Sequence, residues 1–181
     1  MTALQELLKT IVSLQERAPA PTQPADLDDL FQRLAAATLA DARGVENEIW
    51  AAWARHPDGS IQRRLESATR AIAREDYPRA RQLLDPLVRD QPQWAEAWNR
   101  RATLSYLEGR DAESFADIER TLQLEPRHFG AICGFAQVCL RRGERGAALT
   151  AFEVALGINP HLSGVRAAVE DLQDSVGESL H

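Results

Sequence analysis

The chain has 181 residues, enough to bury a hydrophobic core in one domain without disulfides. Its 21 basic and 27 acidic residues give a formal net charge of −6, which argues against the clustered basic surface of a nucleic-acid-binding protein. It contains no apolar run of the roughly 18 residues that a membrane-spanning helix needs. We therefore expect a soluble protein with no nucleic-acid partner and no membrane span.

Residues 1–17 are predicted to form an amphipathic N-terminal helix. Apolar side chains recur there at helical spacing, at Leu4, Leu7, Leu8, Ile11, Val12 and Leu14. Glu6 and Lys9 interrupt the apolar run that a signal peptide would need, so the expected compartment is the cytoplasm. The alternative is a bacterial periplasm, if the native signal is missing from this chain. Residues 18–25 contain three prolines and are predicted to be an extended, semi-rigid linker.

Residues 26–60 are predicted to be a degenerate helix pair in front of more regular repeats. Asp26 can cap a helix over about 27–39, and a second helix over about 42–55 should end before the turn at Pro57. Trp50 and Trp53 lie on one face of this second helix. They could form a shelf for a ligand, but core packing against the next repeat is the favoured interpretation.

A 34-residue period runs through the rest of the chain. Pro92, Pro126 and Pro160 are each 34 residues apart, and each ends a segment that is predicted to be helix, tight turn, helix. The predicted units are 61–94, 95–128 and 129–162. Turn residues recur at the same offset in all three units, at Glu75, Gly109 and Gly143. Residues 163–181 are predicted to be a capping helix and tail that seal the last apolar face.

The middle unit resembles the tetratricopeptide repeat (TPR) at its defining positions, which are Trp98, Ala102, Tyr106, Gly109, Ile118 and Pro126. The resemblance covers 61–162 well and 26–60 weakly, and suggests a small bacterial TPR protein. It implies an all-α fold, a right-handed α-solenoid of helix-turn-helix repeats with a C-terminal capping helix. One departure is Arg101, which stands where a large apolar residue is usual.

In TPR arrays the first helices of successive repeats line a concave groove that binds peptides. By family position, the groove residues implied here are Leu65, Thr69, Ile72, Asn99, Arg100, Thr103, Tyr106, Gln137 and Arg141. Side-chain amides can pair with a peptide backbone, and guanidinium groups can bind carboxylates. The family's carboxylate clamp for heat-shock chaperone tails needs polar side chains at positions that here hold Leu65, Thr69, Arg100, Gly130 and Gly134.

Only Arg100 suits such a clamp, so we expect no binding of chaperone tails in that way. Gly130 and Gly134 instead leave room for a ligand backbone or a packed helix.

The expected function is a protein- or peptide-binding adaptor, co-chaperone or assembly scaffold that takes an extended segment or an amphipathic helix in the groove. The alternative is a homo-oligomerisation module in which residues 2–17 dock into the groove, in cis or on a second copy. A third interpretation is an enzyme that uses Cys133, although no histidine is placed beside it.

No catalytic residue, cofactor or metal is expected. The four histidines have no metal-ligand spacing, and the carboxylate pairs are typical of solvated helix faces. Cys133 and Cys139 lie six residues apart in one predicted helix, about 9 Å along its axis, which is too far for a disulfide. They are expected to be free thiols.

Overall fold

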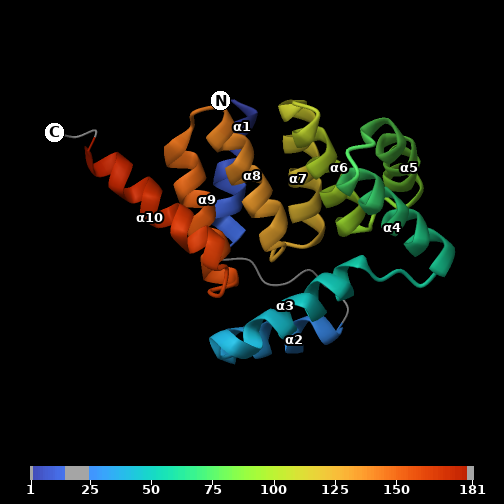
Figure 1. Ribbon diagram of the computed structural model, residues 1–181, viewed down its shortest axis with the longest axis horizontal. Coiled ribbons are helices and arrows are strands. Elements are labelled where there is room, and N and C mark those ends of the chain that lie inside the picture. Colours follow the sequence, from blue (N-terminus) through green and yellow to red (C-terminus); the bar gives the residue numbers. More distant parts are fainter. Residues whose placement is uncertain (1, 15–24, 179–181) are drawn as a thin grey trace.

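The computed structural model describes residues 2–14 and 25–178, and every regular element within these ranges is a helix (Figure 1). The helices are α1 (Ala3–Ser13), α2 (Ala25–Ala36), α3 (Leu39–Ala54), α4 (Gly59–Ala73), α5 (Tyr77–Asp90), α6 (Ala95–Leu107), α7 (Asp111–Leu124), α8 (Phe129–Arg141), α9 (Arg145–Ile158) and α10 (Ser163–Glu178). The predicted all-α class is confirmed. No helix of the described residues is both long and apolar enough to cross a membrane. The linker predicted over 18–25 lies, except for Ala25, outside the described residues.

Helices α4 to α9 form three successive pairs, α4–α5, α6–α7 and α8–α9, that stack side by side (Figure 1). The turn inside each pair uses the left-handed backbone region, at Glu75 with φ 60°, Gly109 with φ 76° and Gly143 with φ 78°. These three residues are 34 positions apart, so the same turn is repeated in every pair. Glycine enters this region without steric cost, whereas Glu75 has a Cβ that meets the backbone.

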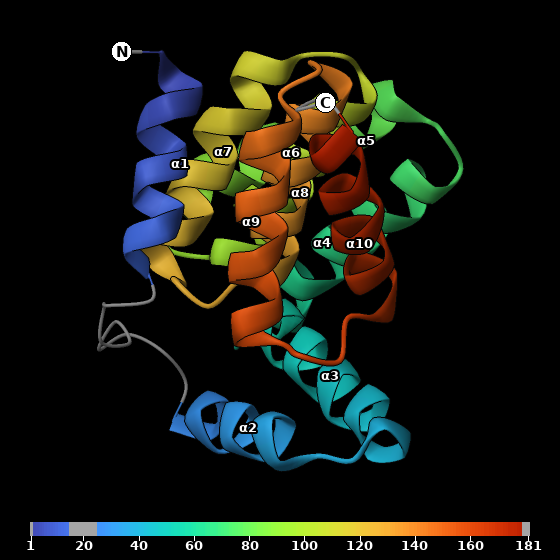
Figure 2. The same cartoon turned by 90° about the vertical axis from the view of Figure 1, so that its left-hand side faces the viewer.

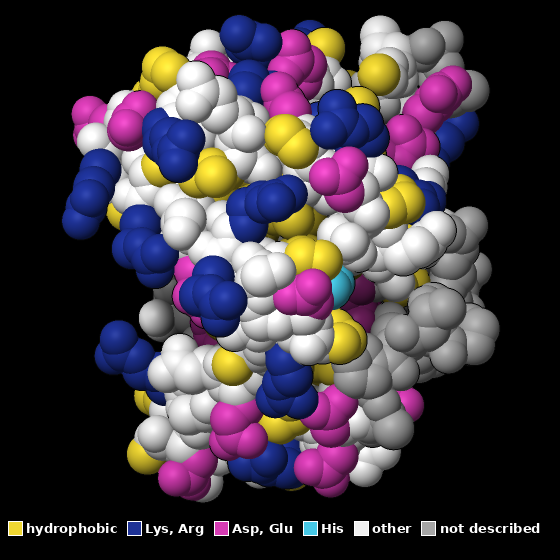
Figure 3. Space-filling model, turned by 90° about the vertical axis from the view of Figure 1, so that its right-hand side faces the viewer, with side chains coloured by type: hydrophobic (Ala, Val, Ile, Leu, Met, Phe, Trp, Pro, Cys, Tyr) yellow, Lys and Arg dark blue, Asp and Glu magenta, His cyan; other side chains and the backbone are white. Residues whose placement is uncertain are grey.

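The α4–α5 pair forms one end of the stack, and α10 packs on α9 at the other end (Figures 1 and 2). Val169 and Leu172 of α10 are buried against the core of the last pair. Figure 3 faces the α4–α5 end of the molecule, whose surface carries many charged side chains of both signs. The two ends of the stack thus have polar outer surfaces, as solenoid ends require.

Helix α1 packs along α7 and α9, the second helices of repeats two and three (Figure 2). Its buried residues Leu4, Leu7 and Ile11 belong to the same core cluster as Phe115 of α7 and Val154 of α9. The prediction that this helix docks into the groove of its own chain is therefore wrong. Its apolar stripe matches the apolar outer surface of α7 and α9, on the other side of the stack from the first helices.

Helices α2 and α3 form a hairpin, called the α2–α3 hairpin below, that folds back beneath the stack (Figure 1). Its core contains Leu34, Ile49 and Trp53 together with Phe129 of α8, and Ile158 and Leu162 pack against it. The two tryptophans pack in the core as predicted, but mainly against His128 and Phe129 at the start of α8. Repeat one contributes Trp94, whose Nε1 donates a hydrogen bond to the Trp53 carbonyl oxygen at 2.9 Å. The backbone turns back at Arg55, which ends α3 in an extended conformation with ψ 136°.

Candidate functional site

A cavity of about 230 Å³ opens between the first helices of repeats two and three. It contains four of the predicted groove residues, Asn99, Thr103, Tyr106 and Gln137. The other lining residues are Ala102, Leu107, Ser114, Ile118 and Gly134. Ala102 and Ile118 are buried and form an apolar floor, while Thr103, Leu107 and Gln137 are exposed at the rim. The arrangement is a small apolar pocket with hydrogen-bonding groups around its mouth.

Gln137 also lines a second, larger cavity of about 640 Å³ between α3, α8 and α10. Leu39 of α3 stands at its edge and is 76% exposed, which is unusual for a leucine in this protein. Because one residue lines both cavities, the two meet at Gln137. The concave surface therefore continues from Leu107 on α6 to Leu39 on α3.

Gly134 and Gly130 differ in what covers them. A Cβ added at Gly134 would meet only Ile118 Cδ1 at 3.9 Å, an ordinary contact, so the cavity stays open there. A Cβ added at Gly130 would lie 2.3 Å from Cη2 of Trp50. The room predicted at Gly130 for a packed helix is thus filled by α3 of the same chain.

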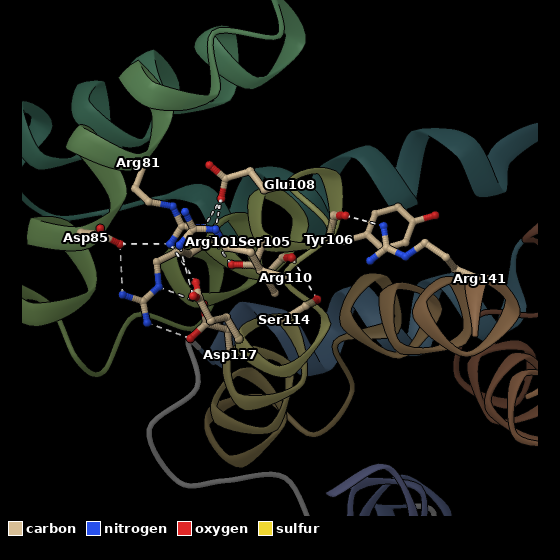
Figure 4. Close-up of polar contacts among 12 residues, drawn as sticks. Arg81, Asp85, Arg101, Ser105, Tyr106, Glu108, Arg110, Ser114, Asp117 and Arg141 are labelled. Carbon is tan, nitrogen blue, oxygen red and sulfur yellow. Dashed lines mark hydrogen bonds and ion pairs between the residues drawn. The ribbon is translucent and has the colours of Figure 1, made fainter.

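Arg141 holds one edge of the open cavity. Its guanidinium carbon lies 4.1 Å from the ring centroid of Tyr106, and its Nη1 donates a hydrogen bond to the Tyr106 carbonyl oxygen at 2.6 Å (Figure 4). It also forms an ion pair with Asp111. The charge of Arg141 is therefore already compensated by Asp111. Arg141 holds Tyr106 in place and is not free to bind the carboxylate of a ligand.

Arg100 belongs to a buried polar cluster beneath the groove. Its Nη2 lies 2.6 Å from Oε1 of Glu96, whose side chain has no exposed surface, and its guanidinium faces the Trp50 ring. Asn99 Nδ2 donates to Oε2 of Glu96 at 3.1 Å. Asn99 and Arg100 thus compensate a buried carboxylate instead of facing a ligand with all their polar atoms.

His128 completes this cluster from the start of α8. Its Nδ1 accepts the backbone N–H of Ala131 at 3.1 Å, so the ring hydrogen is on Nε2, which donates to Glu96 Oε2 at 3.0 Å. Burial favours a higher pKa for Glu96, but the hydrogen bond from His128 and the charge of Arg100 lower that pKa overall. Glu96 is therefore a carboxylate that joins α6 to the start of α8, and its partner Arg100 reaches the Trp50 ring of the hairpin.

Three predicted groove residues lie on α4, and the structure corrects their placement. Leu65 is 2% exposed within the core formed with Ala68 and Leu84, and Ile72 is half-buried against the same cluster. Leu65 lies three residues before Ala68 and Ile72 four residues after it, so all three share one helix face. Thr69 is half-buried and donates its hydroxyl to the Leu65 carbonyl at 3.0 Å. The predicted apolar groove end in repeat one is thus core.

The sequence interpretation missed an ion-pair network that joins repeats one and two (Figure 4). Arg101 binds both oxygens of the buried Asp117 at 2.8 Å and also approaches Asp85 on α5. Arg81 of α5 reaches Glu108 and Ser105 of α6. Arg101 is the departure from the family pattern, and Asp117 sixteen positions later is its complement. An unexpected charge at a core position was the signal that could have revealed the network.

Both thiols lie in surroundings that oppose their ionisation. Burial, with a smaller effect of Glu46, raises the pKa of Cys133 to about 12. Burial, with a smaller effect of Glu144, raises the pKa of Cys139 to about 12 as well. Both residues are free thiols. Among the described residues, no group of three histidine, cysteine or acidic side chains could hold a metal ion.

Known proteins share the fold and the repeat pattern of this chain. No family model matches the chain. A TPR repeat-containing protein of Rhizobium etli is 35% identical over 150 residues, which cover 82% of this chain and 74% of that protein. The Sgt2 TPR domain from Aspergillus fumigatus has a TM-score of 0.61 at 17% identity and covers 68% of this chain and 83% of its own.

A second similar structure is the TPR2B domain of yeast Sti1 in a complex with pHsp70. It has a TM-score of 0.54 at 16% identity and covers 62% of this chain and 98% of its own. At these identities the structures show the fold alone, whereas the relative from Rhizobium etli is similar in sequence over most of both chains. The chain has three stacked helix pairs, a 34-residue period and this relative, and it belongs to the tetratricopeptide repeat family.

Proposed function

We propose that this protein is an adaptor that binds a segment of a partner protein in the cavity between α6 and α8. One observation carries the proposal: Asn99, Thr103, Tyr106 and Gln137, chosen by repeat position, line a single open pocket. The TPR2B domain of yeast Sti1, which has the same fold, forms a complex with pHsp70. By analogy, a protein segment is the class of ligand that we propose here.

The lining of the pocket suggests how a segment would be held. The floor of Ala102 and Ile118 suits one aliphatic side chain, which gains free energy by leaving water. The exposed amide of Gln137 and hydroxyl of Thr103 stand at the rim, where they can pair with backbone groups of an extended chain. An apolar anchor with a polar rim is the usual arrangement of a peptide pocket.

A carboxylate clamp is not part of the proposal. Arg100 and Arg141 are each paired with an acidic side chain, Leu65 is buried, and Trp50 covers Gly130. Recognition of a chaperone tail would need these positions to be open and polar. We therefore propose that the protein recognises an apolar side chain within the partner's sequence rather than the partner's C-terminal carboxylate.

A cavity-filling substitution tests the adaptor function. Gly134→Leu places a branched side chain into the pocket, while Gly44→Leu puts the same change on α3, where a Cβ meets nothing within 4 Å. Cross-linking capture from the native cell should identify a protein that the wild type and Gly44→Leu retain and Gly134→Leu loses. Circular dichroism must show equal helicity for all three. Equal capture by Gly134→Leu and wild type would refute the proposed site.

A further inference from the structure

The outer face of α4, at one end of the stack, carries a row of arginines. Arg63 and Arg70 of α4 and its C-cap residue Arg74 are exposed. Arg63 and Arg70 point away from the core residues Leu65 and Ala68 of the same helix. Within the described residues, none of the three forms an ion pair, although most other arginines of the chain do. Figure 3 faces this end and shows basic side chains, in dark blue, with acidic ones, in magenta, between them.

The outer face of α10, at the opposite end, carries the opposite charge. Glu170, Asp171 and Asp174 are exposed and lie across the helix from the buried Val169 and Leu172. No ion pair of the described residues involves any of these three carboxylates. Figure 1 places α4 and α10 at opposite ends of the molecule.

The helix dipole acts differently on the two rows. Arg70 lies in the last turn of α4 and Arg74 is its C-cap residue, so both stand where positive charge is favoured. The last turn of α10 has no basic residue to offset its acidic side chains. Cations supplied by another molecule would therefore be most favourable beside α10.

The spacing of the two rows also matches. Arg70 in the last turn of α4 and the C-cap residue Arg74 are four residues apart, and Glu170 and Asp174 are four residues apart on α10. Four residues rise about 6 Å along a helix, so both pairs can meet at once when the helices run antiparallel.

We propose that the α10 end of one molecule binds the α4 end of a second copy, so that copies associate head to tail. The contact joins two different surfaces and leaves a free end at each side, so it produces open chains rather than a closed dimer. Exposed ion pairs are individually weak, and they are screened by salt. The association is therefore weak, concentration-dependent and strongest at low ionic strength.

Charge reversal at the two ends tests the proposal with the full-length chain. The first variant is Arg70→Glu with Arg74→Glu, and the second is Glu170→Arg with Asp174→Arg. Sedimentation equilibrium at about 0.01 M salt should show the wild-type average mass rising with concentration, and the rise should vanish at about 1 M salt. Each variant alone should associate about tenfold more weakly, because its two ends then carry like charges.

An equimolar mixture of the two variants is the decisive sample. One variant is acidic at both ends and the other basic at both ends, so the mixture should regain the association that each lacks. Arg43→Glu on α3, outside both end helices, is the control and should associate like wild type. Circular dichroism confirms that each variant is folded. A wild type that stays monomeric at low salt, or a folded mixture that does not associate, would overturn the proposal and leave the charges as solubilising caps only.

Discussion

The indole of Trp53 stacks on the imidazole of His128, with ring centroids 4.0 Å apart and ring planes 12° apart. This contact joins α3 to the N-cap residue of α8. His128 also binds Glu96 of α6, so the stack and this hydrogen bond connect the hairpin to both α6 and the start of α8. The hairpin is consequently part of the folded array and not a separate unit beside it.

Trp53→Ala should undock the α2–α3 hairpin. Trp53 is 6% exposed, and truncation of a large buried aromatic side chain costs roughly 3–5 kcal/mol. Amide hydrogen exchange should become much faster in α2 and α3 while α5 and α7 keep their protection. Unchanged exchange in the hairpin would show that the stack on His128 does not hold it.

Gly130→Ala should destabilise the protein, whereas Gly134→Ala should not. The new Cβ at position 130 lies 2.3 Å from Trp50, so the tryptophan and α3 must shift, at a cost of about 1–3 kcal/mol. The new Cβ at position 134 makes an ordinary contact at 3.9 Å, and alanine favours the helix over glycine. Urea unfolding of the two variants measures the difference, and equal stabilities would contradict it.

Glu75→Gly should stabilise the protein by about 0.5–1 kcal/mol. Glu75 has φ 60°, a region that costs a residue with a Cβ about 1–2 kcal/mol, and glycine gives back part of this through its greater freedom in the unfolded chain. Gly109→Ala, at the same place in the next repeat, should lower the stability by about 1 kcal/mol. Thermal unfolding of both variants checks the pair, which should move in opposite directions.

Stability should fall in acid partly through Glu96. Its pKa is lower in the folded protein than the ordinary value of 4.5, so the folded state binds this proton less tightly than the unfolded state. The stabilisation is complete above pH 4.5 and is lost as the pH falls through the lowered pKa. Glu96→Gln should be less stable at neutral pH and should show a smaller loss of stability between about pH 5 and pH 3.

Asp117 acts in the opposite direction, so the comparison with Glu96→Gln is needed. Burial raises the pKa of Asp117 in spite of Arg101, and this group favours the folded state as the pH falls. Only the difference between wild type and Glu96→Gln isolates Glu96. Parallel pH profiles for the two proteins would contradict its assigned role.

Both thiols should react slowly in the folded protein. The rise of the pKa from 9.0 to about 12 at Cys133 and at Cys139 lowers the thiolate fraction at neutral pH about a thousandfold. Reaction with a chromogenic disulfide reagent should be correspondingly slow, and should become fast in urea. A rapid phase from one thiol in the folded state would revive the interpretation of Cys133 as a nucleophile.

The repeats could be predicted from the sequence because each one is determined by residues that lie close together in the sequence. The prolines at 92, 126 and 160, the turn positions at 75, 109 and 143, and small residues such as Ala102 set helix ends and close packing within 34 residues. The pocket residues Thr103 and Gln137 were implied by the resemblance to the family's repeat positions, and each lies one position after a buried alanine of the core face.

The placement of α1 and of the α2–α3 hairpin could not be predicted in this way. An amphipathic stripe such as Leu4, Leu7 and Ile11 shows that a helix docks, but both sides of the stack offer apolar surface. Likewise, Pro57 fits the repeat period, yet the direction of the hairpin depends on contacts of Trp53 with residues 75 positions away. Packing between residues so far apart in the chain produces no periodic pattern in the sequence.

The hairpin has a consequence for how specificity can be compared among relatives. Leu39 of α3 lines the concave surface beside Gln137 of α8, so the proposed recognition surface is assembled from a segment outside the repeats as well as from the repeats. Two proteins with identical residues in 61–162 would present different surfaces if their 26–60 segments differed. A binding preference can therefore be inferred from a relative of similar sequence only when the relative also shares the α2–α3 hairpin.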